Sequence, residues 1–117
     1  MSKIILIDSG VSNLKSIKNM LDYLHADYDI VSQEFEFDKQ TKIILPGIGN
    51  YGSFVKNLKL RGLIKSIIGA INNNIHFLGI CIGLHFLCKC SEEDSSVEGL
   101  NILENVFVKK FYFEKKI

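Results

Sequence analysis

Residues 75–87 read IHFLGICIGLHFL, and this stretch decides the fold. Ile75 to Ile80 is mostly apolar, as expected of a strand buried in a parallel sheet. The apolar residues that follow begin a helix directly after the strand. Cys81 lies at the junction, with a glycine two residues to each side. The stretch therefore predicts a strand, a tight turn that carries the cysteine, and a helix.

The rest of the chain repeats this alternation of strand and helix. The predicted strands are Lys3–Ile7, Tyr28–Val31 and Lys42–Leu45 (stopped by Pro46-Gly47), with further strand, as a hairpin or an edge, at Val106–Val108 and Phe111–Phe113. The predicted helices run from Asn13 to Leu24 and, in two parts broken at Gly62, from Phe54 to Ile71. Strands that alternate with helices of this length indicate right-handed βαβ units. We therefore expect an α/β fold, an open parallel sheet with helices on both faces.

Length and composition narrow the class of protein. The 117 residues fit one domain, residues 1–117. Lysine and arginine number 14 against 13 acidic residues, so charge gives no case for binding nucleic acid or a membrane surface. The first apolar run is short and ends at Asp8, which argues against a signal peptide. Three cysteines without a secretory signal predict free thiols and a cytoplasmic location.

Cys81 is the residue most suited to chemistry. A side chain between a buried strand and a helix stands on a tight turn, which the flanking Gly79 and Gly83 permit. The turn exposes the sulfur, and the backbone N–H of Ile82 would point toward an oxyanion on the attacked carbon. The competing interpretation is a small buried hydrophobic residue, the usual role of a cysteine. The glycines on both sides favour the nucleophile.

A second loop, Pro46-Gly47-Ile48-Gly49, follows another predicted strand. Reactive groups collect at the carboxyl ends of strands in open α/β sheets, so this loop is expected beside Cys81. Its amides could complete an oxyanion hole, or the loop could be a simple turn. A phosphate-binding loop is disfavoured, because no Lys-Ser/Thr follows and the glycines match neither nucleotide fingerprint.

Several blocks, in order along nearly the whole chain, resemble the N-terminal part of class I glutamine amidotransferases. They are Ile7-Asp8-x-Gly10-x-x-Asn13-Leu14, Leu45-Pro46-Gly47-Ile48-Gly49, Arg61-Gly62-Leu63, Phe77 to Gly83, Ser91-Glu92-Glu93 and Val97-Glu98-Gly99-Leu100. Within that family the chain is most similar to the glutaminase subunits of imidazole glycerol phosphate synthase, an enzyme of histidine biosynthesis.

The resemblance implies a flavodoxin-like fold and hydrolysis of glutamine to glutamate and ammonia. It implies that Cys81 is the nucleophile and that His85 stands in a substrate-binding position. Oxyanion and substrate contacts are implied for Gly47, Ile48, Gly49 and Ile82. The implied partner is the cyclase subunit, which receives the ammonia, and its interface residues would be Asn13, Pro46 and Gly49. No cofactor and no metal are implied.

One part of the family pattern has no match here. Family members carry a His-x-Glu pair far downstream of the cysteine, whereas His85 is the one histidine that follows Cys81 in this sequence. We therefore expect the isolated chain not to release ammonia at a useful rate. It could be a truncated product of a longer gene or a reduced relative that has lost the chemistry. We also expect a sheet that is incomplete at its C-terminal end, with exposed edges that favour self-association or a partner.

Three other classes stay open. A zinc site could use Cys81, His85, Cys88 and Cys90, although Cys81 lies on the turn and no Cys-x-x-Cys pair exists. A cysteine-dependent stress or deglycase-like protein could use Asp8 in place of a histidine, although Asp8 more simply stabilises its own loop. A non-catalytic binding module could retain only the surface for the cyclase.

Overall fold

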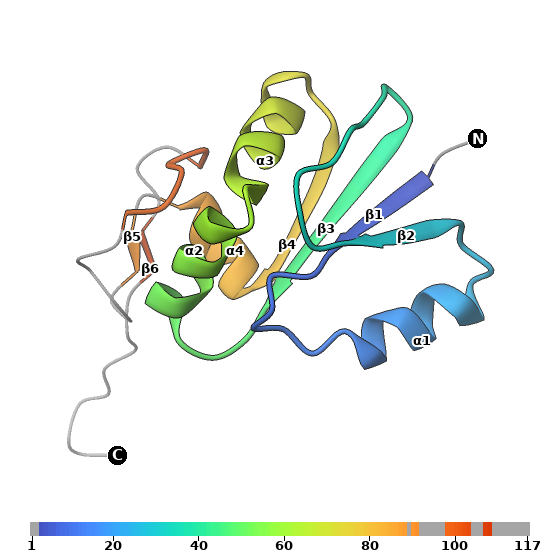
Figure 1. Cartoon of the computed structure of the whole chain (residues 1–117), viewed down its shortest axis with the longest axis horizontal. Helices are drawn as coiled ribbons and strands as arrows, with labels where there is room; N and C mark the ends of the chain where they lie inside the picture. Colours follow the sequence, from blue (N-terminus) through green and yellow to red (C-terminus); the bar gives the residue numbers. More distant parts are fainter. Residues whose placement is uncertain (1–2, 89, 92–97, 104–106, 109–117) are drawn as a thin grey trace, which may run out of the picture.

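The sheet has four strands, all parallel, in the order β2-β1-β3-β4 (Figure 1). The structure is a computed structural model and describes residues 3–88, 90–91, 98–103 and 107–108. The strands are β1 (Lys3–Ile7), β2 (Tyr28–Val31), β3 (Thr41–Gly47) and β4 (His76–Cys81). The predicted α/β class and open parallel sheet are confirmed.

Among the described residues, four helices flank this sheet. They are α1 (Lys15–Tyr23), α2 (Tyr51–Leu60), α3 (Leu63–Asn72) and α4 (Ile82–Leu87). The β1–α1–β2 connection runs in one direction along the sheet, and the connection from β3 to β4 runs in the other. Because such crossovers are right-handed, α1 lies on one face and α2 and α3 on the opposite face. Figure 1 shows α1 beside β2 and the other three helices grouped on the far side.

Local sequence signals set the helix ends. The side chain of Asn50 accepts a hydrogen bond from the N–H of Ser53 (2.9 Å) and so caps the start of α2. Gly62 has a φ of +69°, a left-handed conformation that glycine adopts without cost, and it separates α2 from α3 as predicted.

The core lies between the sheet and the group formed by α2, α3 and α4. β1 and β3 contribute alternate residues to it, and the rings of Phe54 and Phe86 meet edge to face at 6.2 Å. The large side chains that are fully buried include Ile7, Ile43, Leu45, Tyr51, Phe54, Leu58, Leu63, Ile67 and Phe86. This packing holds the strand ends of β3 and β4 rigidly beneath α4.

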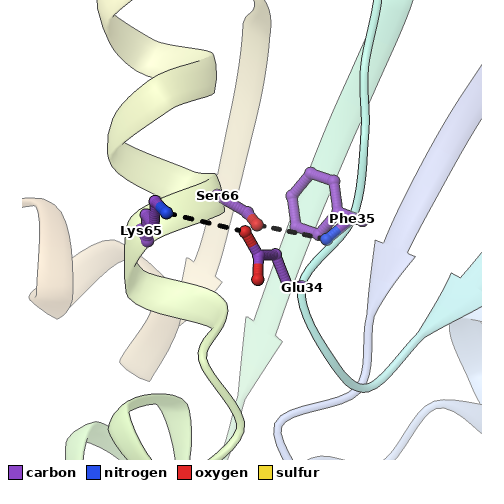
Figure 2. Close-up of polar contacts among 4 residues, drawn as sticks. All are labelled: Glu34, Phe35, Lys65 and Ser66. Carbon is purple, nitrogen blue, oxygen red and sulfur yellow. Dashed lines mark hydrogen bonds and ion pairs between the residues drawn. The ribbon is translucent and has the colours of Figure 1, made fainter.

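Residues 32–40 connect β2 to β3 and pack against α3 (Figure 2). The hydroxyl Oγ of Ser66, which is buried, accepts a hydrogen bond from the N–H of Phe35 (3.1 Å). Lys65 and Glu34 form an ion pair at 3.9 Å on the exposed side of the same contact. The connector is thus anchored to the helical layer by one buried polar bond.

β3 and β4 both end later than the sequence predicts, and their first residues each differ from the prediction by one. β3 was predicted to stop before Pro46, but its ladder with β4 continues through Pro46 to Gly47, and β4 runs on to Cys81. A proline fits here because β1 pairs with β3 only as far as Ile44. One side of β3 is therefore free of ladder bonds at Pro46, and a missing N–H costs nothing there.

Toward the C-terminus, β5 (Cys90–Ser91) and β6 (Phe107–Val108) form a separate parallel pair. The strand predicted at Val106–Val108 is confirmed for its last two residues. Of the Ser91-Glu92-Glu93 block, only Ser91 belongs to the described residues. The strand predicted at Phe111–Phe113 also lies outside them. No helix in the described part of the chain has the length and apolar character that a membrane crossing requires.

Candidate active site

Cys81 occupies the tight turn between β4 and α4. Its backbone has φ 55° and ψ −118°, a conformation that residues with a side chain rarely adopt. The side chain is exposed, whereas Cys88 is buried and its thiol lies 3.6 Å from the carbonyl oxygen of Leu84. Exposure on a strained turn is the arrangement of a nucleophile elbow and not that of a cysteine packed as a small hydrophobic residue.

The two glycines beside the elbow are required by space. A Cβ on Gly79 would lie 2.8 Å from the carbonyl oxygen of Gly83. A Cβ on Gly83 would overlap the carbonyl oxygen of Leu45, in the neighbouring strand. The first turn of α4 therefore sits directly on the strand ends, which is the close approach that lets Cys81 project outward.

The Pro46–Gly49 loop lies next to the elbow, as predicted. Gly47 is the register partner of Cys81 across the β3–β4 ladder. A Cβ on Gly47 would lie 2.5 Å from Cε1 of Phe54 and 3.1 Å from Cβ of Ile82. Gly49 is exposed and has a φ of +86°, so its place in the loop depends on backbone freedom and not on space.

The loop after β1 holds one backbone amide of the Pro46–Gly49 loop, that of Ile48, by a hydrogen bond. The N–H of Ile48 donates a hydrogen bond to the carbonyl oxygen of Val11 (3.1 Å), so this donor is already engaged within the fold. The carboxylate Oδ1 of Asp8 in turn accepts the N–H of Gly10 (2.9 Å), which stabilises the β1 loop. Of the predicted loop donors, Gly49 is therefore a better oxyanion candidate than Ile48.

His85 lies on α4, one turn beyond the elbow. Its ring centroid is 6.2 Å from that of Tyr51, a fully buried residue at the start of α2. A Cβ on Gly99 would approach the Tyr51 hydroxyl to 3.1 Å, so residue 99 is also held close to this group. Gly99, in the last of the family blocks, thus has a physical role beside α4 that its sequence did not reveal.

The same segment closes the end of α4 with three backbone hydrogen bonds. The N–H groups of Leu100, Asn101 and Leu103 donate to the carbonyl oxygens of residues 86, 88 and 87, at 2.8, 3.1 and 3.0 Å. Carbonyls at a helix C-terminus need such partners, and here a distant segment supplies them.

The sequence comparisons decide the family. A family model described as "Glutamine amidotransferase class-I" matches residues 5–114. The chain belongs to this family. The glycine-flanked, exposed cysteine and the adjoining Pro46–Gly49 loop are therefore features of an amidotransferase domain.

Three curated relatives of this amidotransferase chain are named imidazole glycerol phosphate synthase subunit HisH, with the addition HisH 1 in one of them. The protein from Pyrococcus furiosus is 39% identical over 109 residues, which are 93% of this chain and 53% of that protein. The protein from Parasynechococcus marenigrum is 39% identical over 104 residues, 88% of this chain and 50% of that protein. The protein from Leptospira borgpetersenii is 37% identical over 113 residues, 94% and 53% respectively. The chain spans about half the length of these relatives.

The predicted partner-interface residues of this amidotransferase chain differ in exposure. Asn13 and Gly49 are exposed, and the Asn13 Oδ1 accepts the N–H of Lys15 (3.3 Å). Pro46 is buried within β3 and reaches no surface here, because strand pairing continues through it. Of the predicted contacts, Asn13 and the tip of the loop are therefore accessible, and Pro46 is not.

Arg61 was noted only as part of a family block, but the structure places it at the β1 loop. A Cβ on Gly10 would lie 2.5 Å from Nη2 and 3.0 Å from Cζ of Arg61. The guanidinium therefore rests on the backbone at Gly10, where φ is +84°. The sequence pattern did not predict this contact between Arg61, at the end of α2, and Gly10, in the loop after β1.

A metal centre receives no support from the described residues. Among them, no group of three or more histidine, cysteine, aspartate or glutamate side chains is arranged to hold an ion. Cys81 faces solvent while Cys88 is directed into the protein toward Leu84.

Proposed function

We propose that this chain is the nucleophile-bearing part of a glutaminase that supplies ammonia in imidazole glycerol phosphate synthesis. The observation that carries the proposal is the exposed Cys81, held at φ 55° between β4 and α4. The names of the relatives support the histidine pathway over other amidotransferase reactions. A cytoplasmic location, consistent with a free thiol, stays a prediction.

In the proposed reaction, the Cys81 thiolate attacks the side-chain amide carbon of glutamine. The C–N bond breaks, the nitrogen leaves as ammonia after gaining a proton, and a thioester to the cysteine remains. Water then hydrolyses the thioester to give glutamate and the free thiol. The backbone N–H groups of Ile82 and Gly49 are the proposed oxyanion donors, and His85 is a proposed substrate contact.

The proposed partner is a cyclase subunit that consumes the ammonia. Asn13 and the tip of the Pro46–Gly49 loop are its proposed contacts, because both are exposed at the carboxyl ends of the strands. Proximity of this loop to Cys81 supports a route by which ammonia is released toward the partner.

The direct test is covalent labelling. The chain is treated with a glutamine-analogue chloroketone, and the modified residue is found by peptide mass spectrometry. We expect labelling at Cys81 and none at the buried Cys88, with excess glutamine slowing the reaction. A matched chloroketone without the glutamine moiety controls for general thiol reactivity. Equal rates with both reagents would contradict the proposal.

A non-catalytic binding module is the second candidate. It is favoured by one observation: Asn13 and Gly49, the proposed contacts with the cyclase, are exposed whether or not Cys81 reacts. Pull-down by a cyclase subunit, without glutamine-dependent labelling of Cys81, would select this candidate. A stress or deglycase-like protein would show rapid peroxide oxidation of Cys81 and no response to glutamine analogues.

A further inference from the structure

Arg61 follows the last residue of α2, and its backbone is held firmly there. Its N–H donates a hydrogen bond to the carbonyl oxygen of Asn57 (3.0 Å). Leu58, three residues before it, and Leu63, two residues after it, are fully buried in the core. The side chain of Arg61 therefore starts from a fixed point on the helical layer.

The guanidinium of Arg61 lies across the backbone of Gly10. A Cβ at Gly10 would be 2.5 Å from Nη2, 3.0 Å from Cζ and 3.3 Å from Nε of the arginine. Because these three atoms share one plane, the plane covers the position where a side chain at residue 10 would stand. Within the described part of the chain Arg61 belongs to no ion pair, so packing on the backbone accounts for its placement.

The loop after β1, residues 8–13, connects this contact to the loop beside Cys81. Two local side-chain hydrogen bonds, at 2.9 and 3.3 Å, fix the N–H groups of Gly10 and Val11. The carbonyl oxygen of Val11 then accepts the N–H of Ile48 (3.1 Å). A loop that is held at Gly10 therefore also holds the amide of Ile48.

We propose that Arg61 is a positioning residue of the Cys81 site. Its guanidinium holds the loop after β1, and the Val11–Ile48 hydrogen bond passes this restraint to the Pro46–Gly49 loop. The consequence for oxyanion binding rests on the proposed function, whereas the restraint on the loop does not.

The restraint matters because Gly49 comes next in the chain. Its φ of +86° belongs to a residue with wide conformational freedom, so Gly49 does not fix the direction of its own N–H. A fixed amide at Ile48 limits that freedom. Arg61 thus acts on the proposed oxyanion donor from a different helix and without touching substrate.

Amide exchange of Ile48 tests the restraint and needs neither substrate nor activity. In the 117-residue chain, Arg61→Ala should speed this exchange at least about fivefold, because the amide is protected only while both loops stay in place. The amides of β1 report global unfolding, and the change at Ile48 is measured beyond theirs. Circular dichroism checks the fold, and Arg61→Met, which keeps the apolar stem, replaces the alanine variant if that variant unfolds.

Lys59→Ala is the matched control. Lys59 is exposed in the last turn of α2, and its removal takes away the same charge. Exchange at Ile48 should stay within about twofold of the parent in this variant, since Lys59 does not contact the loop after β1.

Gly10→Ala tests the contact from its other side, because the new Cβ would displace the guanidinium. The strain of alanine at φ +84° is present with or without Arg61. If the two residues acted independently, their fold-changes in Ile48 exchange would multiply in the double variant. We expect the double variant to fall short of that product by at least about threefold, since no guanidinium is left to displace.

Labelling of Cys81 tests the consequence for the site. In Arg61→Ala, the preference for the glutamine-analogue chloroketone over the matched reagent should fall at least about threefold, while the rate with the matched reagent stays within about twofold. A parent chain without this preference would contradict the proposed function, and Ile48 exchange then decides the role of Arg61 alone. Equal Ile48 exchange in Arg61→Ala and Lys59→Ala, a double variant at the full product, or a preference that Arg61→Ala leaves unchanged would each overturn the proposal.

Discussion

Gly83 and the carbonyl oxygen of Leu45 are in contact so close that a single methyl group on Gly83 would overlap that oxygen. Gly83 is in the first turn of α4, and Leu45 is in β3. The helix that follows Cys81 is therefore seated on the neighbouring strand β3 as well as on its own strand β4, where Gly79 approaches Gly83. This contact links the orientation of Cys81 to the strand that precedes the Pro46–Gly49 loop.

Gly83→Ala should destabilise the protein by roughly 2–4 kcal/mol, because the new Cβ has backbone on its far side and cannot move a flexible group aside. Urea denaturation followed by circular dichroism measures the change. Gly69→Ala is the control, since its Cβ would meet Phe37 at an ordinary 3.7 Å within α3. That variant should be about 0.5–1 kcal/mol more stable than the parent. An equal change in the free energy of unfolding for both variants would contradict a tight contact at Gly83.

Cys81→Gly should raise the free energy of unfolding by about 1 kcal/mol. Glycine relieves the strain at φ 55°, and the gain exceeds the entropy that it adds to the unfolded chain. Cys81→Ala also removes the thiol, but it keeps the backbone strain at residue 81. Its stability should therefore stay close to that of the parent. Denaturation curves of the three proteins give the comparison. A glycine variant no more stable than the alanine variant would show that the elbow is unstrained.

Ser66→Ala should cost about 1–2 kcal/mol, because it leaves the N–H of Phe35 without its partner in a partly buried place. Lys65→Ala, one residue away, breaks only the exposed ion pair with Glu34 and should cost less than about 0.5 kcal/mol. Figure 2 shows both contacts side by side. Thermal unfolding of the two variants separates them, and a larger loss at Lys65 would refute the ranking.

We expect the protein to lose stability at alkaline pH when the hydroxyl of Tyr28 loses its proton. Its hydroxyl donates a hydrogen bond to Oδ1 of Asp22 (2.7 Å), and this bond raises the pKa of Tyr28 above its ordinary value near 10. Because the pKa of Tyr28 is higher in the folded protein than in the unfolded chain, the stability that this bond contributes is fully present below the unfolded-state pKa. It is lost as the pH rises through the folded-state pKa.

Tyr28→Phe should therefore reduce the alkaline loss of stability, measured as urea midpoints between pH 8 and about pH 11. Tyr23→Phe, at a side chain that is 83% exposed, is the control and should keep the parent slope. The Lys3–Asp29 ion pair, where Asp29 raises the pKa of Lys3, is present in both variants and cancels. Identical slopes in the parent and in Tyr28→Phe would rule out the Asp22 bond as the cause.

Much of the architecture follows from patterns that are local in the sequence. The β2 prediction matched its observed bounds, Tyr28–Val31, because Tyr28, Ile30 and Val31 are typical strand residues and polar residues lie on either side of the segment. Gly62 was expected to separate two helices and does so with positive φ, since its conformational freedom is intrinsic. The family blocks likewise led to the amidotransferase assignment, because their order along the chain is itself a specific signal.

Contacts between segments that are far apart in the sequence could not be predicted from such local patterns. Pro46 was expected to end its strand, but whether a proline is tolerated depends on where the neighbouring strand stops, and β1 stops pairing at Ile44. The engagement of the Ile48 amide by Val11 and the seating of Arg61 on Gly10 each join segments far apart in sequence.

The residues themselves predicted which chemistry to expect, because a cysteine between two glycines after an apolar strand is a local feature. Tertiary structure decided how that cysteine is presented and which distant segments meet. The exposure of Cys81 depends on α4 being pressed against β3 through Gly83 and Leu45. The seating of Arg61 on Gly10 likewise depends on the end of α2 meeting the loop after β1. Both are properties of packing, which arises only when elements separated in the chain come together.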